Sequence, residues 1–315
     1  MKKNMTNETH VEGLLYQHAL EKKTSGENSK NPGTEYIAGT IDIATDDACT
    51  NIVSVHYTYV TATTSKGKTN ATFGTLQNII DGTLATVMNE GKEHAAKVRV
   101  DSAIGLNEFY SDRSGKEELV SVKRNEGGFI HTTDALTEDE KSRDTFKCDM
   151  IITNTVRVEA DEDKGTPEKL IIKGAIFDFR NAILPVEFSA LNPKAMDYFE
   201  GLGATNKEPV FTKVWGHQVS EVIVKTITEE SAFGESSVHE VKNTRKDYVI
   251  TGAATVPYVW DSEDTILASE LVEALSNRET YLATLKKRQE EYNASKGNGS
   301  ATKPAAAPAK GGFNF

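Results

Sequence analysis

Long hydrophobic runs are missing from this sequence of 315 residues, of which 37% are apolar and 26% are charged. Its mean hydropathy is −0.47. No window approaches the ~18 uninterrupted apolar residues that a transmembrane helix requires. We therefore expect a water-soluble globular protein rather than a membrane protein. At about 100 to 200 residues per domain, the length predicts two domains.

Cysteine is also scarce, since Cys49 and Cys148 are the only two in the sequence. Two thiols so far apart are too few for a disulfide framework, a four-cysteine zinc site or a CxxC redox pair. Near the N-terminus, Glu8, His10 and Glu12 interrupt what would have to be the continuous apolar core of a secretion signal. We therefore expect the protein to act in the reducing cytoplasm.

The signatures of common enzymes are absent: the sequence has no GxxxxGK[ST] phosphate loop, no GxGxxG, no GxSxG and no HExxH. The seven histidines are scattered, and His10 with His18 does not make a metal site. The carboxylates at 161–163 lie in a predicted turn, where charge is normally solvated. We expect no enzyme activity, no metal and no cofactor. A carboxylate enzyme stays open as an alternative, because such pairs are recognised by their distance in the fold.

Positive charge is in the minority, with 36 basic against 47 acidic residues and a net charge of −11. This balance argues against general coating of polyanions, but it is compatible with one locally basic face.

The N-terminal region predicts a loosely attached helical arm. Thr9 and Glu12 form a capping box, and apolar residues then recur on one helical stripe. The residues of this stripe are Val11, Leu14, Leu15 and Ala19. The polar, turn-rich stretch 22–33 then reads as a linker. We assign residues 1–34 to an arm and linker.

Residues 35–133 predict a first β domain. β-Branched and aromatic residues over 36–63 indicate two strands, and the apolar spacing over 73–90 indicates a helix that Gly82 weakens. Strands return over 97–110, 117–124 and 127–132. The order is β-β-α-β-β.

Residues 134–260 predict a second β domain, which begins with a short connecting helix over 137–144. Three strands follow over 146–190, and then Asn192 and Pro193 mark the start of a helix. Two long strands complete the domain. The order β-β-β-α-β-β is that of an OB-fold, a five-stranded Greek-key barrel.

The fold class is therefore mainly β with minor α, comprising two OB-like barrels, a C-terminal helix and a disordered tail. Because the first domain resembles the same order more loosely, we expect an internal duplication of architecture. The helix covers 261–294, and the low-complexity stretch 295–315 forms a flexible tail. The apolar stripe of this helix consists of Ile266, Leu267, Leu271, Leu275, Leu282 and Leu285.

Aromatic and basic residues alternate on one predicted strand of the second barrel. If 210–219 is extended, Phe211, Lys213, Trp215 and His217 project to one face, where rings can stack on bases and a cation can contact phosphate. An equally weighted interpretation is that the rings cap a hydrophobic edge and the stem of Lys213 passes them.

Further candidates lie where an OB barrel binds its ligand, on the face of strands two and three and on the adjoining loops. Phe177 and Phe179 lie on the same face of an apolar predicted strand, so a position in the core explains both. For Tyr57 and Tyr59 of the first domain, half-buried packing is the favoured interpretation. In the first domain, Arg113, Lys123 and Arg124 are candidates because they lie beside predicted exposed loops. The candidate nucleic-acid-binding residues are Arg113, Lys123, Arg124, Arg180, Lys213, Trp215, Arg245, Lys246 and Tyr248.

The stretches IIKGAIFDFRNAILPVEF, AMDYFEGL and PVFTKVWGHQVS, together with the strand order over 146–260, resemble OB-fold single-stranded DNA-binding proteins of bacteriophage and replication systems. The resemblance implies sequence-tolerant strand binding in replication, recombination or repair, in the bacterial host cytoplasm if the chain is phage-encoded. It also implies a flexible tail whose tip recruits partners, here with Phe313 and Phe315. The tail differs from the family plan because Lys296, Lys303 and Lys310 are its charged residues and it has no carboxylate side chain.

The leading hypothesis is thus a non-enzymatic protein that binds single-stranded DNA. The alternative is a phage structural or assembly protein, in which the β domains and the C-terminal helix make subunit contacts. Oligomerisation is compatible with both.

Overall fold

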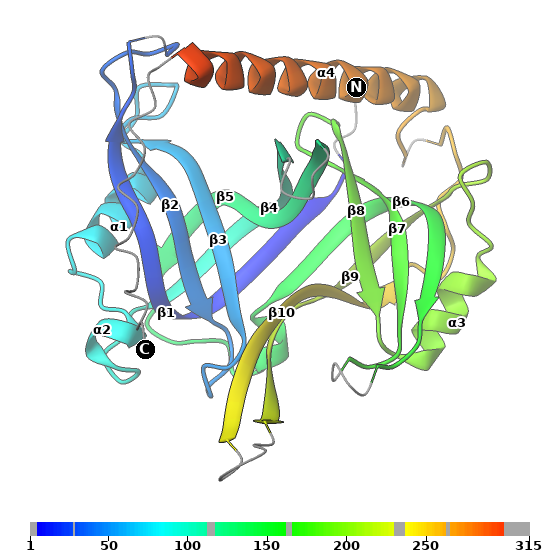
Figure 1. The fold of residues 1–315 in the computed structure, drawn as a ribbon, viewed down its shortest axis with the longest axis horizontal. Coiled ribbons are helices and arrows are strands. Elements are labelled where there is room, and N and C mark those ends of the chain that lie inside the picture. The colour runs from blue at the N-terminus through cyan, green and yellow to red at the C-terminus, as the bar shows by residue number, and fades with distance from the viewer. Residues whose placement is uncertain are drawn as a thin grey trace, which may run out of the picture.

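The protein is built from two β-barrels with a long helix that spans them (Figure 1). The computed structural model describes residues 5–27, 29–111, 117–161, 166–229, 237–262 and 265–298, with backbone alone for 221–229, 237–245 and 295–298.

The first barrel closes through the neighbour order β1-β2-β3-β5-β4-β1, in which β3 and β5 are parallel and the other pairs are antiparallel. Its helices lie between the third and fourth strands. The elements are β1 (Asn7–Thr24), β2 (Glu35–Ala44), β3 (Ile52–Thr61), α1 (Ala71–Ile80), α2 (Val87–Glu90), β4 (Lys97–Ser111) and β5 (Glu118–Thr132).

The second barrel has the same topology, β6-β7-β8-β10-β9-β6, with β8 and β10 parallel. A short 3-10 turn, Glu140–Ser142, precedes it. The elements are β6 (Thr145–Val158), β7 (Lys169–Phe177), β8 (Ile183–Ala190), α3 (Pro193–Gly201), β9 (Val210–Glu229) and β10 (Ser237–Ala253). The predicted fold class, two OB-like barrels in a mainly β chain, is confirmed, and the shared topology supports the expected duplication.

The predicted N-terminal helix is wrong, because residues 7–24 form strand β1 of the first barrel. A register shift between Leu15 and Gln17 interrupts the alternation of the strand and gives its apolar residues a helix-like spacing. Every residue from Val11 to Leu15 is buried, since β1 pairs with β2, β4 and β6. Tertiary pairing therefore outweighs the local capping signal, and the first barrel begins before residue 35.

Two further elements differ from the prediction. The segments 117–124 and 127–132 are one continuous strand, β5, which bends at Gly127 and Gly128. The helix expected over 73–90 is divided into α1 and α2, because the chain turns at Gly82 with φ of 76°.

One helix fills the end of each barrel. Helix α1 buries Leu76 and Ile79 in the core of the first barrel, and α3 buries Met196 and Phe199 in that of the second. Burial of each of these side chains contributes about 1.5 to 3 kcal/mol. Helix α3 starts as predicted, with the Asn192 side chain accepting a hydrogen bond from the Lys194 amide.

A glycine permits close strand approach at corresponding places in the two barrels. A Cβ on Gly39 of β2 would lie 2.1 Å from the Ala19 carbonyl oxygen of β1, and one on Gly174 of β7 would lie 2.0 Å from the Ile151 carbonyl oxygen of β6. Gly39 also has a φ of 133°, which disfavours other residues. In each barrel, a glycine in the second strand thus allows that strand to approach the backbone of the first strand closely.

The two barrels are joined by strand pairing and by two side-chain amides, of which Asn125 is buried and Asn51 partly buried. Strand β1 pairs with β6 over Asn7–Thr9, so one sheet runs through both barrels. The buried Asn125 side chain donates to the Ser54 carbonyl at 3.0 Å and to Gln218 Oε1 at 2.6 Å. It accepts a hydrogen bond from the Tyr248 hydroxyl at 3.0 Å. Its amide is therefore fully bonded between the barrels.

A second amide, Asn51, repeats this arrangement nearby. Its Nδ2 donates to Asp144 Oδ2 at 2.7 Å and to the Gln218 carbonyl at 3.0 Å, and its Oδ1 accepts from the Ser220 amide at 2.6 Å. Satisfied buried polar groups fix orientation, because any shift leaves donors or acceptors without partners. The barrels are accordingly held in one relative position.

Helix α4 (Ala268–Asn298) begins later than the predicted residue 261 and spans both barrels (Figure 1). Ile266 and Ala274 pack with Phe177 and Phe211, which attaches this end to the second barrel. Arg278 forms a two-point ion pair with the buried Glu108 of β4, which attaches the helix to the first. Among the described residues, no helix combines the length and apolar character needed to cross a bilayer.

The Gly39→Ala substitution should destabilise the protein by about 2 kcal/mol or more, because the new Cβ meets backbone and the φ is unfavourable. Urea denaturation monitored by circular dichroism measures the change. Gly74→Ala in α1 is the matched control, since open space surrounds that position. It should be neutral or stabilise by up to about 1 kcal/mol. Equal effects of the two substitutions would contradict the close-approach explanation.

Asn125→Ala should lower the free energy of unfolding by about 2 to 4 kcal/mol, because it leaves Tyr248 and Gln218 without their partner. Asn206→Ala, at an exposed loop position, should stay within about 0.5 kcal/mol of the native protein. Denaturant titration of both variants checks this. A harmless Asn125→Ala would mean that the amide network does not hold the barrels together.

Candidate nucleic-acid interface

Three adjoining hollows form a groove between the barrels, which we call the inter-barrel groove. The first lies between β3, β5 and the β7–β8 turn, and the second between residues 5–8, β4 and the same turn. The third lies between β4, β5, β7, β8 and α4. Glu126 and Phe179 line both the first and the second, and Leu106 lines both the second and the third. The hollows therefore adjoin one another along the junction between the barrels.

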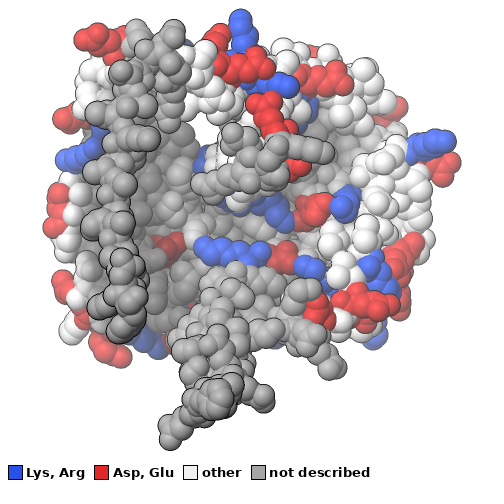
Figure 2. All heavy atoms as spheres, viewed as in Figure 1, with Lys and Arg blue, Asp and Glu red and all other residues white. Residues whose placement is uncertain are grey.

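The charge along this face is mixed. Figure 2 shows Lys and Arg side chains gathering across the middle of the face, with Asp and Glu side chains interspersed. Glu8, Glu126 and Asp178 are among the acidic residues that line the groove. Basic and acidic residues thus line the groove in nearly equal numbers, and the groove is not basic as a whole.

Two phenylalanine rings are exposed in the groove, Phe129 at 70% and Phe179 at 74%. Phe129 follows the bend of β5 at Gly127 and Gly128, and Phe179 lies in the tight β7–β8 turn. The Asp178 side chain shapes that turn by accepting hydrogen bonds from the Arg180 and Ala182 amides. The local backbone, a bend before Phe129 and a hydrogen-bonded turn at Phe179, thus places both rings outside the cores of the barrels.

Arg180 lies against the Phe179 ring, with its guanidinium carbon 4.8 Å from the ring centre. A planar cation on a ring face is a favourable cation–π arrangement and leaves N–H groups directed outward. Arg180 is exposed and lines the first hollow. The predicted site residue therefore lies in the groove, beside a ring that we had expected in the core. Phe177, by contrast, is fully buried as expected.

A third ring borders the first hollow. Tyr59 is 46% exposed and packs on Tyr36 with ring centres 4.5 Å apart. Tyr57, two residues earlier in the same strand, is buried. The predicted packing role therefore holds for Tyr57, whereas Tyr59 packs on Tyr36 and also exposes part of its ring to solvent. The position of each ring in the sequence could have indicated its exposure. Tyr59 lies near the end of a strand, Phe129 follows a pair of glycines, and Phe179 lies in a turn.

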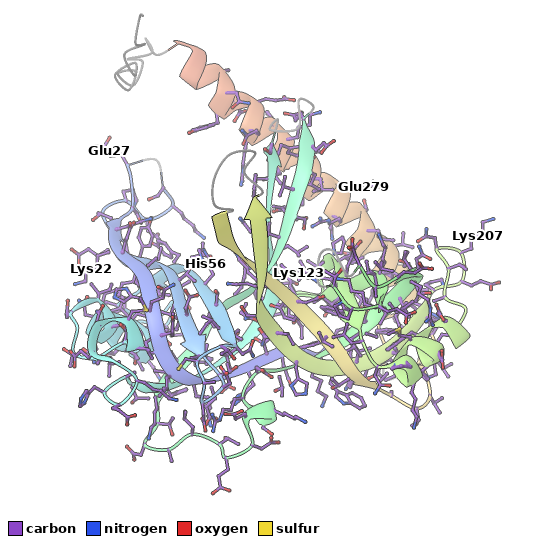
Figure 3. The ribbon with its side chains drawn as sticks, turned by 60° about the horizontal axis from the view of Figure 1, so that its bottom comes forward. Lys22, Glu27, His56, Lys123, Lys207 and Glu279 are labelled. Carbon is purple, nitrogen blue, oxygen red and sulfur yellow. The ribbon has the colours of Figure 1, made fainter. Side chains whose placement is uncertain are left out.

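Lys123 and Lys246 approach the space between the barrels from opposite sides. Lys123 of β5 lines the third hollow, while Lys246 of β10 donates to Ser54 Oγ of β3 at 2.8 Å. Figure 3 places Lys123 between the barrels and His56 on the side of the first barrel that faces the second. Burial, helped by the nearby Arg124 charge, lowers the pKa of His56.

Arg124 is half-buried and bound to a carboxylate. Its Nε and Nη2 donate to Glu126 Oε1 at 2.7 and 2.5 Å. An arginine held in this way contributes little free positive charge to a ligand. Arg124 thus sets the position of Glu126 at the edge of the groove.

Lys213 and Trp215 share the outer face of β9, as predicted, but neither is among the residues that line the groove. Lys213 lies 3.6 Å from Asp149 Oδ1, and despite the opposing effect of burial, Asp149 and Tyr258 hold its pKa above the usual value. The Trp215 ring is 41% exposed and lies directly over Gly252. The predicted convergence of these two side chains with Arg180 and Lys246 is wrong.

Tyr248 is not a stacking platform. Its ring is buried between Phe146 and Phe188, its hydroxyl is bonded to Asn125, and burial raises its pKa. The prediction is wrong because the residue points to the inside of β10, where it completes the core. The pattern of alternation did not reveal which parity of this strand faces inward.

Four predicted residues are not placed. Arg113, Phe313 and Phe315 lie outside the described residues, and so does the side chain of Arg245. Within the described part of the chain, no group of three His, Cys, Asp or Glu side chains could hold a metal ion.

Over residues 6–288, the sequence matches the family model YorF. No curated protein matches the chain. The structure is similar to a crystal structure of a deletion and substitution mutant of the single-stranded DNA binding protein from Thermus aquaticus. That similarity has a TM-score of 0.45 at 9% identity and covers 82% of this chain and 98% of the other. A similarity at this level does not extend to function. Because the family model spans most of its length, the chain belongs to the YorF family.

Proposed function

We propose that the protein binds single-stranded DNA along the inter-barrel groove, without strong sequence preference. The observation that carries the proposal is the presence of Phe129, Phe179 and Tyr59 around one hollow, with Arg180 on the second of these rings. Every base has a flat π-face, so exposed rings bind unpaired bases with little regard to sequence.

The exposure of the two phenylalanines supports this role. Single exposed apolar residues are common on protein surfaces, but here the rings border the same hollow and come from different barrels. Neither ring is needed by the core of its own barrel, since both are largely exposed. A ligand that stacks on them would remove their faces from water.

The backbone of a bound strand would lie against basic groups, of which Arg180 is the best placed. Its guanidinium can contact phosphate while its plane stays on Phe179. The acidic residues of the groove oppose close approach of further phosphates, so we expect binding that is moderate and sensitive to salt. Duplex DNA has its bases stacked internally and would not offer faces to these rings.

In the cell, a protein of this kind would protect exposed strands during replication, recombination or repair, in the cytoplasm. Recruitment of partners by Phe313 and Phe315 stays a prediction. The alternative role in assembly would appear as large oligomers formed without nucleic acid.

Phe179→Ala should weaken binding of fluorescent oligo-dT by about 5- to 150-fold, because one base–ring stack contributes about 1 to 3 kcal/mol. Fluorescence anisotropy at two salt concentrations measures both affinity and its salt dependence. The control is Met88→Ala, which removes an exposed apolar side chain from α2, on the side of the first barrel away from the second. It should leave affinity unchanged.

Two results would contradict the proposal. One is the absence of binding by the native protein, or binding that is indifferent to salt. The other is a Phe179→Ala variant that binds as tightly as the native protein.

A further inference from the structure

The third hollow of the groove, beneath α4, is the one that the C-terminal helix helps to enclose. Its volume is about 670 Å³, and it is bounded by β4 and β5 on one side, β7 and β8 on the other, and Arg278 and Leu282 of α4. The ion pair between Arg278 and Glu108 holds the helix in place over it. This hollow is therefore enclosed on more sides than the open part of the groove near Phe129.

Lys123 of β5 lines this hollow where it meets the core of the second barrel. Its ammonium lies 5.3 Å from the centre of the Phe188 ring and 5.4 Å from that of Tyr248, and it donates to the Glu187 carbonyl. Among the described residues, no carboxylate oxygen forms an ion pair with it. Burial lowers its pKa, against the charges of Asp247 and Glu187, which act at longer range. An ammonium so placed is poorly compensated.

The other charges of the hollow are already paired with one another. Arg278 binds Glu108, and Lys173 lies 2.8 Å from Glu187. With Lys123 included, three cations face two carboxylates, so one positive charge is left over. Ring faces and a carbonyl stabilise a cation less than a direct anionic partner does.

We propose that this hollow binds one backbone phosphate of the strand, with the Lys123 ammonium as its direct partner and Lys173 at its edge. This inference rests on the proposed function, because it treats the hollow as a continuation of the groove. Leu106 lines both this hollow and the second one, and Phe179 is among the residues that line the second. A strand whose bases stack near Phe179 could therefore place a phosphate beneath α4.

Lys123→Met tests the assignment, since methionine keeps the apolar stem and removes the charge. We expect about tenfold weaker binding of oligo-dT and a plot of log K against log salt that is shallower by about 0.7, the value for one phosphate of a single strand. Anisotropy titrations over a salt series measure both. Lys207→Gln is the control, because Lys207 is exposed at the outer margin of the second barrel (Figure 3). It should change neither quantity.

Because Lys123 packs on two core rings, thermal unfolding of its variant is measured first. If Lys123→Met does not fold, Lys173→Gln replaces it as the test variant, because Lys173 is half-exposed at the edge of the hollow. We then expect a smaller loss of affinity and a shallower salt dependence. Phe129→Ala gives the contrasting result, a loss of affinity with the salt dependence unchanged, because it removes a stacking ring that, among the described residues, holds no basic side chain in place.

The outcomes separate the two proposals. Failure of the native protein to bind oligo-dT overturns both, whereas native-like affinity and salt dependence in the lysine variants overturn the phosphate site alone. A third arm adds inorganic phosphate at constant ionic strength. If it raises the melting temperature of the native protein but not of Lys123→Met, while oligo-dT binding is unaffected by the substitution, the hollow takes free phosphate and the strand assignment is wrong.

Discussion

The fixed relation between the two barrels is the constraint on which the groove depends. Strand β1 pairs with β2 and β4 of its own barrel and with β6 of the other, and the amides of Asn51 and Asn125 bond across the junction. A groove whose two sides come from different barrels keeps its width only if these contacts persist. The aromatic rings and the lysine beneath α4 are useful to a ligand because their spacing is set in this way.

Much of the architecture could be predicted from sequence periodicity. The second barrel was predictable strand by strand, because β-branched and other apolar residues gather in segments bounded by polar turns, and Asn192 with Pro193 marks its helix. The first strand was not, because the bulge near Leu15 gives its apolar residues a helical spacing. A local pattern describes the chain alone, while the burial of β1 depends on three partner strands that are distant in sequence.

The site was less predictable than the fold. Arg180 and Lys123 both line the groove, while their part in binding stays a prediction. Lys123 was expected in an exposed loop before Gly127 and Gly128, but it lies within strand β5. Tyr248 was wrongly predicted to stack on bases, because the alternation of residues along a strand does not tell which face of the strand lies inside the barrel. Phe129 and Phe179 were missed since an apolar residue near a strand end is usually core, and their exposure follows from a bend and a turn.

The central claim, that a strand lies between the barrels on Phe129 and Phe179, is tested most directly by photo-crosslinking. Oligo-dT carrying 5-iododeoxyuridine is irradiated with the native protein, and the modified residues are identified by mass spectrometry. The account predicts adducts at Phe179, Phe129 or Tyr59. Adducts confined to Trp215 on the outer face of β9, with none in the groove, would contradict it.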